Sequence, residues 1–304
     1  MSLQLRILNP LLRLIEKRYL SNMPSVEHAR IRFERNARWH FHTPKGVYNR
    51  REVLRHDGHE IEALAVETGP VPGDAALLYL HGGGYFMASA EGYKCLAGSI
   101  ARAAGMRAYL PDYRLAPEHP FPAALDDALA AYQALQAKGI SRIAIGGDSA
   151  GGGLALALLH LICTMNLPQP VATVAISPWV DLTLSSPTLV SNESSDVMLP
   201  AKHLPEVVAA YCGDTPADDP RVSPQFGAFT GAAPVLVHAS QAEIFLGEAE
   251  ALVAAMDEQG VDVTFQTMDD TPHVWHLFHG FLPEADNAIA SIGSFLRQRL
   301  ADTT

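Results

Sequence analysis

From residue 75 onward, short apolar runs alternate with longer helical patterns, and this alternation limits the possible folds more than any other feature. The apolar runs are rich in β-branched and aliphatic residues, as strands buried on both faces are. Consecutive parallel strands need a crossover segment between them, which is usually a helix. The alternation therefore predicts an α/β protein with a mainly parallel sheet and helices on both faces.

Eight candidate strands can be assigned, at Arg50–Arg55, Glu60–Glu67, Ala75–Leu80, Met106–Leu110, Ser141–Ile145, Val171–Ser177, Pro234–Ala239 and Val261–Met268. Only the first two strands require a hairpin, and Asp57-Gly58 has the composition of its turn. Helices are expected at Ala90–Ala104, Pro122–Ala137, Ala150–Met165, Gly247–Gln259 and Glu284–Leu300.

The 304 residues are expected to form a single domain, since no long linker divides them. Residues 1–45 form an N-terminal segment in which apolar and basic residues alternate at helical spacing, which predicts two amphipathic helices. Residues 46–304 form the core. Within the core, residues 182–230 interrupt the strand–helix alternation and read as an insertion with a helix near Lys202–Tyr211.

The formal charge of −11 is unevenly distributed. Residues 1–60 hold 12 Lys and Arg against 6 Asp and Glu, so the rest of the chain carries −17. An acidic protein repels a phosphate backbone, so we expect no nucleic-acid partner. The basic segment favours a solvated helical face over a patch for an anionic membrane or substrate.

The three cysteines, Cys95, Cys163 and Cys212, lack metal-ligand spacing, and no secretory signal pattern opens the chain. We therefore expect a cytoplasmic protein. The most apolar stretch, Gly151–Met165, is too short to cross a bilayer, so no stable membrane insertion is predicted.

The segment Gly147–Gly151, Gly-Asp-Ser-Ala-Gly, follows a predicted strand and opens a predicted helix. This strand–turn–helix setting is typical of a nucleophile elbow, in which Ser149 is held on a sharp turn. Side chains at Gly147 or Gly151 would collide with the neighbouring strand and helix. The alternative is that Ser149 only caps the helix.

A second glycine-rich segment, His81–Gly84, follows the predicted strand that ends at Leu80. Bare backbone amides in such a loop can approach a ligand without hindrance. Gly82 and Gly83, together with the Ala150 amide at a helix N-terminus, are the expected donors of an oxyanion hole. An ordinary flexible loop is the alternative interpretation.

With these motifs the sequence resembles the bacterial hormone-sensitive-lipase-like (group IV) carboxylesterases, within the α/β-hydrolase superfamily. The motifs of the resemblance are His81–Gly84, Asp112–Ala124, Gly147–Gly152 and Ser177–Asp181. They span the central half of the chain in the family's order. The resemblance implies the α/β-hydrolase fold with an eight-stranded sheet, a Ser–acid–His triad and a helical cap from the N-terminus.

The resemblance places the triad acid in the loop after Ala239, at Glu243, where the family usually has an aspartate. Either carboxylate can orient an imidazole. Glu243 could instead favour the next helix through its dipole. In that case the acid would be Asp181, Glu248 or Asp270.

The histidine of the resemblance is His273, while His276 and His279 follow it closely. No accompanying carboxylate or cysteine makes a recognised metal-ligand pattern, so we expect no metal and no cofactor. His276 and His279 are expected to line the site or to pack. The chain order Ser149, Glu243, His273 is that of α/β-hydrolases.

The predicted function is hydrolysis of small, short-acyl carboxylic esters through an acyl-enzyme. An amidase or deacetylase remains an alternative, as does a non-catalytic small-molecule-binding protein of the same fold. Possible wall residues of the substrate pocket are Trp39, Tyr85, Phe86, Trp179, Trp275 and Phe278. The edge strand at Val261–Met268 would permit a homodimer.

Overall fold

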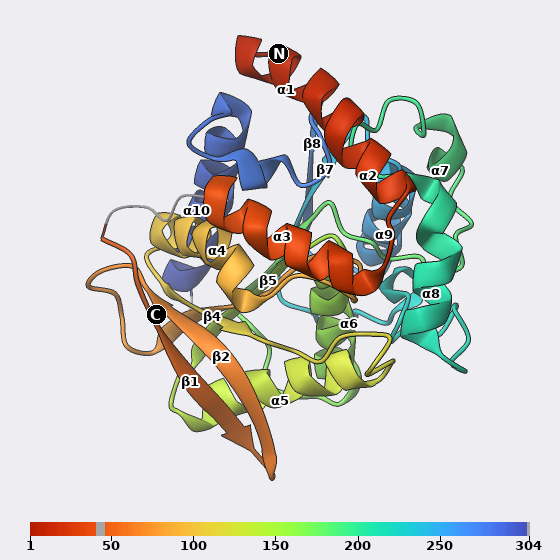
Figure 1. The fold of residues 1–304 in the computed structure, drawn as a ribbon. Coiled ribbons are helices and arrows are strands. Elements are labelled where there is room, and N and C mark those ends of the chain that lie inside the picture. Colours follow the sequence, from red (N-terminus) through yellow and green to blue (C-terminus); the bar gives the residue numbers. More distant parts are fainter. Residues whose placement is uncertain (41–45, 303–304) are drawn as a thin grey trace.

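The computed structural model describes residues 1–40 and 46–302, except for the side chains of residues 38–40. Eight strands form one sheet in the order β1-β2-β4-β3-β5-β6-β7-β8 (Figure 1). The strands are β1 Tyr48–His56, β2 His59–Glu67, β3 Ala75–Leu80, β4 Arg107–Pro111, β5 Arg142–Asp148, β6 Ala172–Ile176, β7 Val235–Ser240 and β8 Val263–Met268. The predicted α/β fold with an eight-stranded sheet is confirmed.

The sheet is antiparallel only at the β1 end. There β1 pairs with β2, and β2 pairs with β4, while every later pairing is parallel. The predicted hairpin is present, with His56 opposite His59. Its turn residues Asp57 and Gly58 both have positive φ, 45° and 83°, as a two-residue type I′ turn requires.

Helices cover both faces of the sheet (Figure 1). One face carries two helices that pack on each other, α4 Ala90–Ala104 and α10 Pro283–Asp302. The other face carries α5 Ala123–Ala137, α6 Ala150–Thr164 and α9 Leu246–Glu258. The ends of α4 follow its sequence, since the Ser89 side chain accepts the Gly92 amide and Gly105 ends the helix with a φ of 71°.

The N-terminal segment is helical, as the amphipathic pattern predicts. It consists of α1 Leu3–Leu12, a π-helical turn Arg13–Lys17, α2 Arg18–Ser21 and α3 Val26–His40. The expected boundary of this segment at residue 45 lies outside the described residues.

Polar contacts hold this segment on the core. Ser2 bonds to Glu284 on α10, with distances of 2.7 Å from its amide and 2.9 Å from its hydroxyl. The Arg30 guanidinium donates to the carbonyl oxygens of Phe86 at 2.7 Å and Ala116 at 2.9 Å. The segment is therefore bonded to the core at α10 and just after the glycine-rich loop His81–Gly84.

The segment between β6 and β7 departs from the strand–helix alternation. It holds α7 Thr188–Ser191, a 3₁₀ turn Ala201–His203, α8 Leu204–Cys212 and a 3₁₀ turn Pro224–Phe226. The helix expected near Lys202–Tyr211 is thus α8 with the turn before it.

The turn between β5 and α6 is packed too tightly for side chains at its glycines. A Cβ atom on Gly147 would lie 2.2 Å from the Gly151 carbonyl oxygen. A Cβ atom on Gly151 would lie 2.2 Å from the Leu80 carbonyl oxygen and 2.3 Å from that of His81. These backbone atoms cannot yield without moving β3, which confirms the steric reason for both glycines.

We expect the variant Gly151→Ala to lose stability by about 2 kcal/mol or more, because the new methyl group overlaps two backbone carbonyls. Gly73→Ala is the matched control, since nothing lies within 4 Å of a Cβ at that position. Urea unfolding followed by circular dichroism measures both variants. Equal midpoints for the two variants would contradict the packing argument.

Candidate active site

The three residues expected to form the triad follow three strands of the sheet. Ser149 follows β5, Glu243 lies after β7, and His273 lies after β8. Because the carboxyl ends of parallel strands meet at one edge of a sheet, the loops that carry these residues are brought to the same edge. Ser149 and His273 both line one cavity at this edge.

Ser149 has a strained backbone, with φ 53° and ψ −126°. Such a conformation persists only where the surroundings fix it. Here the Ser149 amide donates to the Ile176 carbonyl at 2.9 Å, and the Ser149 carbonyl accepts the Trp179 amide at 3.0 Å. The Ser149 side chain makes no capping hydrogen bond to the helix it precedes. The alternative of a simple helix cap is therefore not what the geometry shows.

His273 and Glu243 are joined by a hydrogen bond of 2.7 Å between Nδ1 and Oε2. Both side chains are buried. The second oxygen of Glu243 accepts the Ser240 amide at 2.9 Å, which fixes the carboxylate. The other ring nitrogen of His273, Nε2, is buried and has no hydrogen-bond partner among the described residues. It is thus available to a group in the cavity.

The other carboxylates considered for the triad have different partners. Asp181 accepts the hydroxyl groups of Thr183 and Ser185, at 2.5 Å and 2.7 Å. Glu248 accepts the amides of Val180 and Asp181. Asp270 is exposed.

The charge of Glu243 decides the protonation behaviour of His273. Burial lowers the pKa of the His273 imidazole, but the hydrogen bond and the negative charge of Glu243 raise it. The net result is a pKa above the ordinary value of 6.5. More distant carboxylates of Asp196 and Asp148 add to the increase. Glu243 therefore stabilises the imidazolium form, as an orienting acid must.

The glycine-rich loop His81–Gly84 differs in one respect from the expectation that Gly82 and Gly83 donate to an oxyanion. The Gly82 amide donates to Oδ1 of Asp148 at 3.1 Å, so it is already bonded. The cavity is lined instead by Gly83 and Gly84 of the same loop. Gly83 and Gly84 have φ values of 116° and 61°, which turn this part of the loop away from the β3 direction.

Asp148 is a buried residue next to Ser149 whose contacts the sequence did not indicate. Its buried carboxylate accepts hydrogen bonds from the hydroxyl groups of Tyr79 and Tyr93, each at 2.9 Å, as well as from Gly82. Burial raises the pKa of Asp148 to about 6, although the tyrosine hydrogen bonds oppose the increase. The available signal was the position of an acid between a buried strand and Ser149, where a buried charge needs hydrogen-bond partners.

Asp196 is another residue whose contacts the sequence did not indicate. It connects the segment between β6 and β7 to the loop that carries Glu243. Its carboxylate accepts the Ile244 amide at 3.1 Å, next to Glu243. It also accepts the amides of Met198 and Leu199, at 2.8 Å and 2.9 Å. Met198 and Leu199 line the cavity, so one buried carboxylate holds both a cavity wall and the loop of the candidate acid.

The cavity has a volume of about 1590 Å³. Apolar side chains from the N-terminal helices form much of its wall, among them Leu8, Leu11, Leu12, Ile15, Phe33 and Ala37. Of the wall residues expected from sequence, Phe86, Trp179 and Phe278 line it. Tyr85 instead stacks on Tyr211, Trp275 packs with Leu5, and the side chain of Trp39 lies outside the described part.

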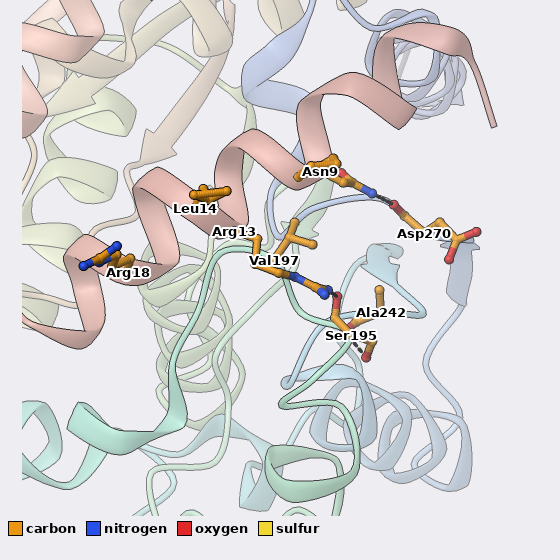
Figure 2. A pocket seen from close by; sticks show the side chains of 9 residues that line it. Asn9, Arg13, Leu14, Arg18, Ser195, Val197, Ala242 and Asp270 are labelled. Carbon is orange, nitrogen blue, oxygen red and sulfur yellow. Dashed lines mark hydrogen bonds between the residues drawn. The ribbon is translucent and has the colours of Figure 1, made fainter.

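A second hollow of about 660 Å³ lies between α1 and the loops that contain Ser195, Ala242 and Asp270. Figure 2 shows the contacts that border it. Asn9 donates to the Asp270 carbonyl at 2.7 Å, and the Ser195 hydroxyl donates to the Ala242 carbonyl at 2.9 Å. The Arg13 guanidinium donates to the Ser194 carbonyl at 2.8 Å. The N-terminal helix is thus bonded both to the insertion and to the loop after β8.

Of the remaining histidines of the last loop, His276 is buried in the core, whereas His279 is partly buried and lines the cavity. His276 pairs with His238, with 3.0 Å between Nε2 and Nδ1, and His279 lies 3.4 Å from the Ser99 hydroxyl. Within residues 1–40 and 46–302, no group of three or more His, Cys, Asp or Glu is arranged to hold a metal ion. In the same part of the chain, no helix is long and apolar enough to cross a membrane.

A mainly parallel eight-stranded sheet, with a strained serine after β5 and a carboxylate–histidine pair after β7 and β8, has the architecture of the α/β hydrolases. A family model described as the α/β hydrolase fold matches residues 77–277. The chain belongs to this family, and within it to the bacterial hormone-sensitive-lipase-like esterases. It is a carboxylic ester hydrolase.

Three relatives support this assignment. An acetyl-hydrolase of Streptomyces hygroscopicus is 38% identical over 73% of this chain and 75% of its own. An ethyl acetate hydrolase of Pseudomonas putida is 33% identical over 80% of each chain. The crystal structure of an esterase from the bacterial hormone-sensitive lipase family superposes with a TM-score of 0.90 at 35% identity, covering 98% of this chain and 99% of the other.

The pKa of His273 gives a test of the Glu243 contact. If the neutral imidazole is the active form, kcat/KM rises with pH and its midpoint lies above 6.5. In Glu243→Gln the charge is lost while burial remains, so the midpoint moves to lower pH, and the maximal rate falls by about 10²-fold or more. Initial rates on a soluble ester between about pH 5 and 9 measure both effects.

The control is Glu60→Gln, because the Glu60 side chain is 62% exposed and pairs with Arg55 on the β1–β2 hairpin, and neither residue lines the cavity. An unchanged midpoint in Glu243→Gln would show that Glu243 does not control the histidine.

Proposed function

We propose that the chain hydrolyses small carboxylic esters with Ser149 as nucleophile, His273 as general base and Glu243 as the orienting acid. The observation that carries the proposal is the buried 2.7 Å hydrogen bond between Glu243 and His273, beside a cavity that Ser149 also lines. Glu243 accepts from Nδ1, which leaves Nε2 of His273 to take the serine proton. Attack of the Ser149 oxygen on the ester carbonyl gives a tetrahedral intermediate.

Collapse of this intermediate expels the alcohol, which receives the proton from His273, and leaves an acyl group on Ser149. Water, deprotonated by the same histidine, then attacks the acyl-enzyme and releases the acid. The amides of Gly83, Gly84 and Ala150 are proposed to stabilise the oxyanion. Gly83 and Gly84 line the cavity, and Ala150 is the first residue of α6, whose dipole favours negative charge.

A short acyl chain is the proposed preference. Trp179 and Phe245 stack with ring centroids 5.4 Å apart, and both line the cavity. The rings of Phe245 and His273 are nearly perpendicular, with centroids 5.6 Å apart. These rigid rings occupy space beside the base, so they limit the acyl group on one side. The names of the acetyl-hydrolase and the ethyl acetate hydrolase support the same preference.

The N-terminal helices are proposed to act as a cap, because they supply cavity wall while the candidate triad belongs to the core. A cytoplasmic location is proposed from the three cysteines, which form no disulfide in the described part of the chain and so fit a reducing compartment. A homodimer is proposed through β8, the last strand of the sheet order, whose outer edge is open to pairing.

Ser149→Ala is expected to lower kcat/KM on a short-acyl chromogenic ester by on the order of 10³-fold or more, because the nucleophile is removed. Ser291→Ala is the matched control, as Ser291 lies on α10 and bonds to Gln266. An organophosphonate probe is expected to form an adduct at Ser149, detected by mass spectrometry of the peptide. A near wild-type rate in Ser149→Ala would exclude Ser149 from the reaction.

Across p-nitrophenyl esters from acetate to palmitate, kcat/KM is expected to peak at the short acyl chains. The variant Phe245→Ala removes one aromatic wall beside His273, so its optimum is expected to move to longer chains. The measurement is the ratio of kcat/KM between octanoate and acetate esters in both proteins. A ratio that does not increase in Phe245→Ala would contradict the role given to this ring.

A further inference from the structure

The continuous helical run formed by α1, the π-helical turn and α2 exposes an apolar stripe. Leu3, Ile7, Leu11 and Leu14 are 69%, 53%, 50% and 65% exposed, and Ile15 is 59% exposed. The first four are spaced four, four and three residues apart, so they lie along one side of the helix. Isolated exposed apolar residues need no explanation, but a row of them on one helix marks a surface that contacts something.

The same helix has a separate side that the core covers. Leu5 is fully buried against Trp275, and Leu8 packs with the same cluster. Leu12 faces the cavity. Packing on the core therefore uses only part of the apolar surface of α1, and the stripe is not needed for it.

The charges around the stripe are basic. Arg6 on α1, Arg13 in the π-helical turn and Arg18 on α2 are all exposed, and Arg18 follows Leu14 by one turn. Figure 2 shows Arg13 directed to Ser195. The acidic residue of this stretch, Glu16, is taken up by Arg32 in a pair of hydrogen bonds at 2.7 Å and 2.8 Å. The face thus combines apolar side chains with positive charge, although the whole chain carries −11.

The stripe also adjoins the active-site cavity. Leu11 and Ile15 belong to both the stripe and the cavity wall. Phe281, in the loop before α10, also lines the cavity and is 52% exposed. An apolar surface that contacts the stripe would therefore lie beside the opening of the cavity.

We propose that this stripe docks the enzyme on an anionic lipid surface. The helix lies in the plane of the interface, with Leu3, Ile7 and Leu14 in the acyl region and Arg6 and Arg18 at the headgroups. This partner satisfies the two features that the face combines, since an uncharged apolar partner would not pair with Arg6 and Arg18, whereas Arg13 is already bonded to the Ser194 carbonyl. Docking brings the cavity opening to a phase in which apolar esters are concentrated.

The test measures binding of Ser149→Ala protein to vesicles by co-sedimentation, so that no hydrolysis interferes. Vesicles of phosphatidylglycerol and phosphatidylcholine are compared with phosphatidylcholine alone. We expect binding to the anionic vesicles, weakened on the order of tenfold or more by the charge-neutral pair Ile7→Gln and Leu14→Gln. The control is Val190→Gln, which removes an apolar residue that is 83% exposed on α7.

The pair Arg6→Gln and Arg18→Gln separates charge from apolar contact. It is expected to weaken binding to the anionic vesicles while leaving the weaker binding to phosphatidylcholine unchanged. Circular dichroism shows whether each variant is folded. The same substitutions are also made in protein that retains Ser149, and the rate of this protein on a soluble ester shows whether each variant is active. Because binding is measured without catalysis, its failure is distinct from a failure of the proposed function.

Two results would overturn the proposal. One is anionic-vesicle binding that is absent, or equal in the Ile7/Leu14 variant and the Val190 control. The other is a fall in molecular mass of the Ile7/Leu14 variant in light scattering, without a change in vesicle binding, which would assign the stripe to contact with a second copy of the chain.

Discussion

The buried carboxylate of Asp148 joins the two loops on which the proposed chemistry depends. It ends β5 immediately before Ser149, and it holds the amide of Gly82, which follows β3. Two tyrosine hydroxyl groups complete its hydrogen bonding. Removal of the carboxylate would leave all three donors buried without a partner, which costs more than the bonds themselves contribute. This carboxylate therefore helps to fix the position of the His81–Gly84 loop relative to Ser149, together with the pairing of β3 with β5.

The rest of the site is fixed by further contacts between loops, rather than by any single strand. The Ser177 hydroxyl accepts the Val274 amide at 3.2 Å, which ties the histidine loop to the end of β6. The Ser240 hydroxyl donates to the Thr271 carbonyl at 2.6 Å, which ties the acid loop to the same segment. These buried bonds keep the imidazole oriented before substrate arrives, and such preorganisation lowers the cost of reaching the transition state.

Features that depend on neighbouring residues could be predicted from the sequence. The strand–turn–helix around Ser149 and the Asp57-Gly58 hairpin are local, and both are present. The pairing of Glu243 with His273 could be anticipated only through the family resemblance, because 30 residues separate them. The hydrogen bonds of Asp148 could not be anticipated, since Tyr79 and Tyr93 lie 69 and 55 residues away. For the same reason the sequence could not show that Gly82 is already bonded.

The N-terminal helices that line the cavity and the loops that carry Ser149, Glu243 and His273 differ in the burial of the polar contacts that hold them. The N-terminal helices are attached by partly exposed polar contacts, such as Ser2 with Glu284 and Arg30 with Glu118. Exposed pairs of this kind contribute little stability, because water and ions compete for them. The bonds of Glu243 and Asp148 are buried, where no such competition exists. The exposed polar pairs of the N-terminal helices therefore contribute less than the buried bonds of the candidate site, and the burial of Leu5 against Trp275 is the stronger attachment of α1 to the core.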